Sequence, residues 1–196
     1  MKKLTLTLFI IFLIFSSKAF AADNKIVKRI TEGKESAKIT IIAYESLTCG
    51  HCANFHKDVY PELKKDFIDK GLVRIEFRHF PLDLAAFNAS KIAQCNNDGN
   101  SNILNVLYSG QKKWARGKTP EEATGYLKKF LESENIKLDF EKCLSDKAIE
   151  DYVLNDRIDG VKKFEVNATP TIIINDKKFD KALNYKNLKK YLEKLI

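Results

Sequence analysis

Apolar side chains recur along this chain with two spacings, one typical of strands and one typical of helices. Residues 39–44 form an apolar, β-branched run that predicts a buried strand at about residues 38–44. Residues 72–80 alternate apolar with polar side chains, which predicts a second strand. Residues 53–70 between them predict a helix, because apolar side chains recur at intervals of four: Phe55, Val59, Leu63 and Phe67. Two strands joined through a helix are expected to lie parallel in one sheet.

Local features refine this first unit. Pro61 removes one internal N–H, so the helix is expected to kink or break near Tyr60. Gly71 is suited to end it, because glycine adopts the left-handed backbone common after a helix. The polar residues 22–38 are expected to form a loose lead-in, with a short edge strand near residues 26–27.

From about residue 82 to residue 165 the spacing is helical. Residues 84–94 and 103–114 predict two helices. One face of the first is expected to hold five side chains: Leu84, Ala85, Asn88, Ile92 and Cys95. Thr119 before Pro120 predicts the start of another helix, and Ser145 is expected to cap a further helix that runs to about residue 164.

The last part of the chain returns to a strand pattern. Residues 171–174 predict a strand, residues 175–177 a turn, and residues 178–179 a short partner strand. Residues 187–196 predict an amphipathic terminal helix. The complete order is β-α-β, a helical insert at about residues 82–165, and β-β-α, which defines an α/β fold.

The first 21 residues have the pattern of a secretory signal peptide. Lys2 and Lys3 precede an apolar core at residues 4–15, and residues 19–21 offer a small-x-small cleavage site. The apolar core is shorter than the roughly 20 residues of a membrane-spanning helix, so we expect a cleaved signal; the alternative is an uncleaved anchor. Cleavage after Ala21 leaves residues 22–196 as one domain, exported to the periplasm.

The charge of the chain does not indicate a nucleic-acid partner. The formal net charge of +8 falls to +5 when the three lysines of the signal peptide are removed. The remaining lysines are scattered along helical stretches near acidic residues, and no basic cluster is interleaved with aromatic side chains. These lysines are therefore interpreted as a solvated surface.

The strongest chemical signal is Cys49-Gly50-His51-Cys52, where the first strand passes into the first helix. Helix N-termini stabilise a thiolate through free N–H groups and the helix dipole. The alternatives are an inert disulfide and a zinc site that includes His56. No second paired motif supplies further ligands, so we expect no metal and no other cofactor. His56 and His79 receive no role.

Four cysteines allow three pairings. Cysteines of an exported chain tend to be paired or redox-active. If Cys49 and Cys52 react with each other, Cys95 and Cys143 are left as a second pair, a candidate structural disulfide in the helical insert. Its alternatives are two separate buried thiols and a second redox-active pair, although the latter lacks a Cys-x-x-Cys motif.

With these features together, the chain resembles the thioredoxin superfamily and, within it, the DsbA family of exported disulfide oxidoreductases. The resemblance rests on the position of Cys49-Gly50-His51-Cys52, the helical insert, and Thr169-Pro170-Thr171 just before the third strand. It implies a thioredoxin fold over most of residues 36–196.

The resemblance also implies roles for individual residues. Cys49 would be the exposed nucleophile and Cys52 its buried partner in a redox disulfide. His51 would favour the Cys49 thiolate. A cis bond before Pro170 would turn the Thr169 backbone towards a bound peptide.

Three departures from the family pattern concern the redox properties. Gly50 replaces the proline that DsbA proteins often carry, and Cys-Gly-His-Cys is typical of the milder eukaryotic protein disulfide isomerases. Thr48 stands where thioredoxins place a tryptophan. The usual buried acid is replaced by Ala43, whereas Glu45 lies two residues on, on the same strand face, and is a candidate for proton transfer to Cys52.

The expected function is therefore disulfide formation in reduced, unfolded exported proteins. The resemblance implies a membrane quinone-linked oxidase as the partner that reoxidises the protein. Only about 15 residues separate the cleavage site from the first strand, which leaves no room for the dimerisation domain of envelope isomerases, so we expect a monomer. The alternatives are a disulfide isomerase or reductase, and a non-catalytic chaperone or binding module.

Overall fold

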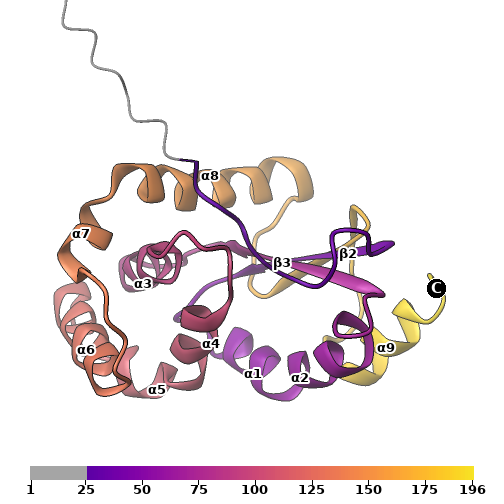
Figure 1. Ribbon diagram of the computed structural model, residues 1–196, viewed down its shortest axis with the longest axis horizontal. Helices are drawn as coiled ribbons and strands as arrows, with labels where there is room; N and C mark the ends of the chain where they lie inside the picture. The colour runs from indigo at the N-terminus through magenta and orange to yellow at the C-terminus, as the bar shows by residue number, and fades with distance from the viewer. Residues whose placement is uncertain (1–25) are drawn as a thin grey trace, which may run out of the picture.

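The computed structural model describes residues 26–196 as a central sheet with helices on both faces and a helical subdomain at one end (Figure 1). The predicted signal peptide and its cleavage site lie outside the described residues. No helix within residues 26–196 combines the length and the apolar character that are needed to cross a membrane.

The sheet has the strand order β1-β3-β2-β4-β5. Its strands are β1 (Ile30–Glu32), β2 (Ile39–Glu45), β3 (Val73–His79), β4 (Thr171–Ile174) and β5 (Lys177–Lys178). Strands β2 and β3 are parallel, as the helical connection between them predicts, with Ile41 opposite Ile75. Strands β1, β4 and β5 join their neighbours in antiparallel pairs.

The connection between β2 and β3 is helical but not continuous. It consists of α1 (Gly50–Asp58), α2 (Tyr60–Leu63) and a π-helical turn, Lys64–Ile68. The interruption falls at Val59, directly before the helix that contains Pro61, which confirms the predicted break. Gly71 follows with a φ of 72°, as expected for a residue after a helix end.

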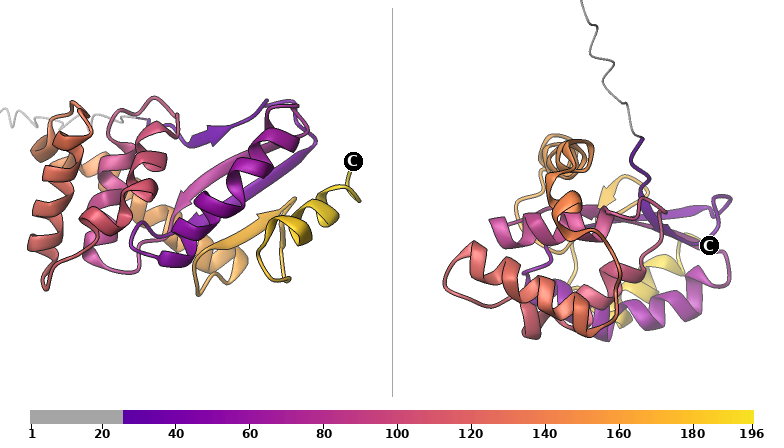
Figure 2. Two further views of the ribbon diagram at one scale, coloured as in Figure 1. Left: turned by 90° about the horizontal axis from the view of Figure 1, so that it is seen from below. Right: turned by 60° about the vertical axis from the view of Figure 1, so that its left-hand side comes forward.

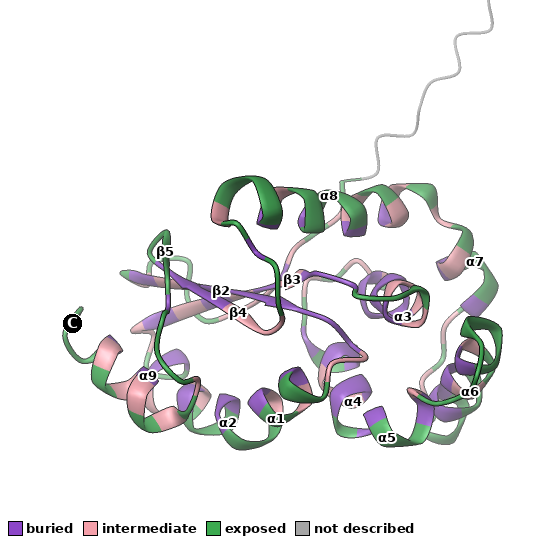
Figure 3. Cartoon of the chain, turned by 180° about the vertical axis from the view of Figure 1, so that it is seen from behind, coloured by how far each residue is buried: buried purple, intermediate pink, exposed green. Residues whose placement is uncertain are grey.

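Two apolar clusters lie on opposite faces of the sheet. The larger joins the sheet to α1, α2 and the terminal helix α9 (Tyr185–Leu192), and includes Phe55, Leu63 and Leu188. The smaller lies under α8 (Lys147–Phe164) and contains Tyr44, Phe80 and Ile173, among others. Figure 3 shows the buried strands between the helices of the two faces. The continuous burial of β2 follows from this covering of both sides.

The segment between β3 and β4 is helical, as predicted. Its helices are α3 (Leu84–Gln94), α4 (Asn102–Ser109), α5 (Gln111–Trp114), α6 (Pro120–Ser133), α7 (Phe140–Ser145) and α8. Most of them gather at the end of the molecule away from the C-terminus (Figure 2, left). A disulfide between Cys95 and Cys143 connects the end of α3 to α7, with the two Cα atoms 5.4 Å apart.

The structure corrects several local expectations. The edge strand is not at residues 26–27 but at Ile30–Glu32, where its residues pair with β3, and Ile26 is exposed. The expected face of α3 is confirmed at its C-terminal end, where Ile92 is buried in the core and Cys95 packs against it. It is wrong at its start, where Leu84 is exposed and the small side chains of Ala86 and Ala89 are buried instead. Packing of α3 against other helices of the insert selects these small residues.

Boundaries in the second half of the chain also shift. Ser145 does not cap α8; it ends α7, and Asp146 caps α8 by accepting a hydrogen bond from the backbone N–H of Ile149. Strand β5 begins and ends one residue earlier than expected, at Lys177–Lys178. Helix α9 begins at Tyr185, two residues earlier, after the cap residue Asn184.

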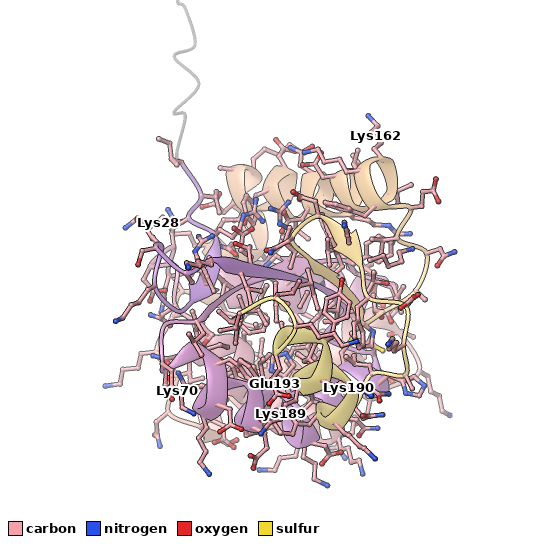
Figure 4. All side chains as sticks on the ribbon, turned by 90° about the vertical axis from the view of Figure 1, so that its right-hand side faces the viewer. Lys28, Lys70, Lys162, Lys189, Lys190 and Glu193 are labelled. Atoms are coloured by element: carbon pink, nitrogen blue, oxygen red, sulfur yellow. A yellow bond between two sulfur atoms is a disulfide. The ribbon has the colours of Figure 1, made fainter. Side chains whose placement is uncertain are left out.

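Basic side chains are distributed over several elements. The five lysines labelled in Figure 4 come from the segment before β1, the turn before β3, α8 and α9. Two of them, Lys70 and Lys189, lie within 4.0 Å of Asp66. Lysines and acids are therefore interspersed at this end of the molecule.

Candidate active site

The Cys-x-x-Cys motif lies where β2 passes into α1. The peptide N–H of Cys49 donates to the carbonyl of Ser46 at 3.0 Å, and Cys49 is the residue directly before α1. This turn places Cys49 half-buried at the helix N-terminus, whereas Cys52, one helical turn on, is fully buried. The two thiols are not bonded to each other in this structure.

The surroundings of the two sulfurs shift the pKa values of Cys49 and Cys52 in opposite directions. A hydrogen bond from the Cys52 thiol is the main cause that lowers the pKa of Cys49 to about 5, against the opposing effect of partial burial. The Thr169 side chain and the backbone N–H groups of Cys52 and His51 add to the lowering. Burial raises the pKa of Cys52 well above its ordinary value, and the nearby Glu45 carboxylate adds to this. The site therefore holds one stable thiolate beside one thiol that keeps its proton.

The loop before β4 closes over the Cys49 sulfur. The Cys49 sulfur lies 3.3 Å from the backbone carbonyl oxygen of Thr169, to which it donates when it is protonated, and the Thr169–Pro170 peptide bond is cis. Beside this contact lies a cavity of about 490 Å³, whose lining includes His51, Pro170 and Tyr185. The structure thus brings together the motif and the loop that the sequence placed 120 residues apart.

Gly50 and His51 lie on the exposed first turn of α1. A side chain at Gly50 would meet no atom within 4 Å, so packing does not require glycine there. The expectation that the His51 ring favours the thiolate is not matched by a contact, because the hydrogen bond from His51 to the Cys49 sulfur comes from its backbone N–H. The imidazole itself is exposed to solvent.

The helical insert contributes a residue that the sequence did not indicate. Gln111 in α5 donates from its side-chain amide to the carbonyl oxygens of Leu47, at 2.8 Å, and Cys49, at 3.0 Å. Both carbonyls belong to the turn that leads into α1. No motif marks Gln111, because a single glutamine in an amphipathic helix is ordinary; only the fold places it here.

Glu45 is buried at the end of β2 and has an unexpected partner. Its Oε2 lies 2.8 Å from Nε2 of His56, and both side chains are at most 6% exposed. The His56 ring stacks on Tyr108 of α4 with the ring centres 4.0 Å apart. His56 had received no role, although its position four residues after Cys52 puts both on one face of α1 and could have indicated proximity.

The described residues offer no place for a metal ion. Within residues 26–196, no three His, Cys, Asp or Glu side chains are grouped so that they could hold one. His56, the residue of the alternative zinc interpretation, faces the Glu45 carboxylate. The remaining cysteines, Cys95 and Cys143, are joined to each other in the insert.

Comparison with known proteins identifies the family. The family model described as thioredoxin matches residues 25–194, so the chain belongs to the thioredoxin family. Within that family it is DsbA-like: the crystal structure of alpha-DsbA1 from Wolbachia pipientis superposes with a TM-score of 0.76 at 29% identity, covering 87% of this chain and 92% of that one.

Curated relatives carry names that describe disulfide chemistry. A putative protein-disulfide oxidoreductase of Rickettsia bellii is 30% identical over 148 residues, which are 73% of this chain and 55% of that protein. Disulfide bond formation protein D of Bacillus subtilis is 27% identical over 171 residues, 83% of this chain and 74% of that protein. The chain spans about half the length of the Rickettsia bellii relative.

Proposed function

We propose that this protein is an exported thiol–disulfide oxidoreductase that forms disulfide bonds in reduced proteins through Cys49 and Cys52. The observation that carries the proposal is the contrast between the sulfurs: the pKa of Cys49 is lowered to about 5, and burial raises that of Cys52. A stabilised thiolate is a good leaving group, and it stabilises the reduced enzyme, so the disulfide form is a strong oxidant.

The reaction is two successive thiol–disulfide exchanges. A substrate thiolate attacks Cys49 Sγ of the enzyme disulfide; a bond forms between these sulfurs, and the electron pair of the broken Cys49–Cys52 bond goes to Cys52, which takes up a proton. A second substrate thiolate then attacks the substrate sulfur of this mixed disulfide. The substrate disulfide forms, and Cys49 leaves as a thiolate. The enzyme has gained two electrons from the substrate.

Attack at Cys49 rather than Cys52 follows from access. Cys49 is half-buried and Cys52 fully buried, so a polypeptide reaches only the first sulfur. The cavity beside Pro170 and the carbonyl of Thr169 offer the substrate an apolar wall and a backbone hydrogen-bond acceptor next to that sulfur. Gly50 and His51 supply the exposed turn around it. Substrates are therefore proposed to be unfolded chains that bind weakly in extended form.

The cellular setting is proposed from the sequence and the family. Residues 1–21 are proposed to be a signal peptide that is removed on export to the periplasm, leaving a domain at residues 22–196 that acts as a monomer. Reoxidation requires an acceptor of two electrons, proposed to be a membrane quinone-linked oxidase. The Cys95–Cys143 disulfide is proposed to be structural.

The test uses purified mature protein and a reduced peptide that carries two cysteines. We expect the oxidised protein to form the peptide disulfide in equal molar amount and Cys49→Ser to abolish this. Offered the peptide in its disulfide form instead, Cys52→Ser should form a mixed disulfide, because its Cys49 thiolate attacks the peptide disulfide and one peptide thiolate leaves. A chaperone or binding module would keep its activity in Cys49→Ser. A reductase would show, in equilibrium with glutathione, a potential near thioredoxin's value of about −270 mV, which contradicts the proposed oxidase.

A further inference from the structure

Glu45 and His56 form a buried ionisable pair that the proposed exchange reaction does not yet use. An ionisable pair with at most 6% exposure is unusual in a protein interior, where charged groups are costly. This pair lies on the face of the sheet that also holds Cys52, and the Glu45 carboxylate is close enough to Cys52 to affect its ionisation. The exchange reaction requires a proton at that sulfur.

The hydrogen bonds of the pair are incomplete. Glu45 uses Oε2 for His56, while its Oε1 is buried without a hydrogen bond of good geometry among the described residues, and the Tyr108 hydroxyl, also buried without one, lies near this carboxylate. Nδ1 of His56 is likewise buried without one. Buried polar groups in proteins are generally satisfied, so unpaired atoms on one acid–imidazole pair indicate a role in chemistry or in water exchange. A structural pair would be expected to use these atoms for bonds to the protein.

A route from the pair towards solvent is present. His56, Tyr60 and Tyr108 line a cavity of about 930 Å³ between α1, α2, α4 and α5, on the side of α1 that also includes His51. The cavity borders the His56 side chain, although Nδ1 of the ring is itself buried, whereas Glu45 and Cys52 do not line the cavity. The order from solvent inwards is therefore cavity, His56, Glu45 and Cys52.

We propose that His56 is the positioning residue that connects the buried Cys52 to solvent protons, by exchanging a proton between the cavity and the Glu45 carboxyl group. The inference rests on the proposed thiol–disulfide exchange. When the Cys49–Cys52 bond breaks, the electron pair goes to Cys52 and the Glu45 carboxyl group gives it a proton. His56 accepts one proton, supplied from the side of the cavity, at Nδ1 and passes one from Nε2 to Oε2 of Glu45. During reoxidation the same proton moves in the opposite direction, as the Cys52 thiolate forms and attacks.

Imidazole suits this step because it accepts a proton at one nitrogen while donating from the other, near neutral pH. The titratable and charged groups around it are Glu45 from β2, Cys52 from its own helix, Tyr60 from α2, Tyr108 from α4 and, further along the sheet, His79 from β3. Burial raises the pKa of both tyrosines, so they remain neutral and do not compete for the proton.

The test compares the parent with His56→Gln, which keeps a polar side chain but does not exchange protons in this way. Stopped-flow rates for oxidation of a dithiol peptide are measured across pH, in water and in deuterium oxide. We expect His56→Gln to slow peptide oxidation at least about tenfold, because a group that transfers protons is lost. The oxidation rate of the parent should depend on pH and on deuterium oxide, and the variant should lose both dependences. The Cys49 thiolate, followed by its ultraviolet absorbance, should still titrate at about pH 5.

Two further variants separate proton transfer from packing. In His56→Ala the missing ring opens onto the cavity, and added imidazole should restore the rate, which a purely structural role does not predict. His79→Gln removes another buried histidine, one bonded to Gln94 rather than to an acid, and should keep the pH profile of the parent. If His56→Gln fails to fold, Glu45→Gln provides the same comparison.

The outcomes distinguish this inference from the proposed function. A parent protein that oxidises the peptide, together with a His56→Gln variant of identical rate, pH profile and isotope effect, overturns the role of His56 alone. Equal changes in His56→Gln and His79→Gln also overturn it, because the effect would then reflect general disturbance of the core. A parent protein that oxidises no dithiol overturns the proposed function itself.

Discussion

Gln111 of the helical insert donates a hydrogen bond to the carbonyl oxygen of Cys49, 3.0 Å away. The same amide nitrogen reaches the carbonyl of Leu47, and this side chain is buried. The insert therefore does more than cover the thioredoxin core: it holds the backbone turn that carries Cys49. This contact gives a direct way to test how far the insert determines the reactivity of Cys49.

Replacing Gln111 by leucine removes the donor while keeping a side chain of similar size. The buried carbonyl of Leu47 then loses this donor, and the carbonyl of Cys49 keeps its bond from the Ala53 N–H, so we expect the free energy of unfolding to fall by about 1–3 kcal/mol. We also expect the pKa of Cys49 to shift from its value in the parent protein, because the turn that positions its sulfur is free to move. Denaturant unfolding and absorbance titration measure the two effects. A variant identical to the parent in both would show that the turn is held without Gln111.

The thiolate of Cys49 is expected to titrate at about pH 5 in the reduced protein. In Cys52→Ala the thiol that donates to it is absent, so the pKa of Cys49 should rise towards the ordinary value of about 8.5. Ultraviolet absorbance and the rate of alkylation across pH measure this. Cys49→Ser is the control that should show no titration in this range. A parent midpoint near 8.5 would contradict the electrostatic description of the site.

Stability should depend on pH in the reduced protein. Because folding lowers the pKa of Cys49 from about 8.5 to about 5, the folded state favours the thiolate. This contribution to stability is fully present above the pKa that Cys49 has in the unfolded state. It is lost as the pH falls through the pKa that Cys49 has in the folded state. The free energy of unfolding, relative to that of Cys49→Ser, should therefore rise between pH 5 and about pH 8.5. The oxidised protein, in which Cys49 does not titrate, should lack this rise.

Removing the disulfide of the insert should affect stability more than redox activity. Cys95 and Cys143 are separated by 48 positions in the chain, and closing a loop of that size stabilises a fold by about 3–4 kcal/mol on the chain-entropy model. We expect Cys95→Ala with Cys143→Ala to lose about this amount in denaturant unfolding and to keep oxidising a dithiol peptide. Loss of oxidation in a folded double variant would assign this second disulfide a redox role.

Gly110 lies between α4 and α5 where the ring of Phe130 approaches the backbone. A Cβ atom there would lie 1.9 Å from Cζ of Phe130, a buried side chain with little freedom to move. We expect Gly110→Ala to destabilise the protein by about 1–3 kcal/mol. Gly125, within α6, is the matched control: a side chain there meets nothing within 4 Å, so alanine should be neutral or should stabilise the helix by about 0.5–1 kcal/mol.

The chemistry of the reactive pair could be read from the sequence because it depends on local features. Cys49 and Cys52 follow a β-branched strand and lie at the start of a helix. The free backbone N–H groups of a helix start are present however the rest of the chain packs. Two other features also have local causes. Strands β2 and β3 are parallel because a helix connects them, and the helix is interrupted before Pro61 because proline lacks an N–H group.

Other features arise only from contacts between distant segments. Helix α3 turns the small Ala86 and Ala89 inwards instead of Leu84, because neighbouring helices approach closely there and periodicity alone does not register such packing. The strand at Ile30–Glu32 is selected by a partner strand 43 or more residues away. For residues with a weak local preference for helix or strand, tertiary contacts therefore decide the conformation and the burial.

The sequence by itself determined the fold class and the position of Cys49 and Cys52 at a helix N-terminus, since strand and helix periodicity and a helix start act over a few residues. Only the tertiary structure decided that Glu45 faces His56, that Gln111 holds the Cys49 turn, and that Thr169 meets the Cys49 sulfur. Each of these contacts joins separate elements, and its geometry depends on how the whole core packs. A hydrogen bond acts only over about 3 Å, so its partners exist only once that packing is complete.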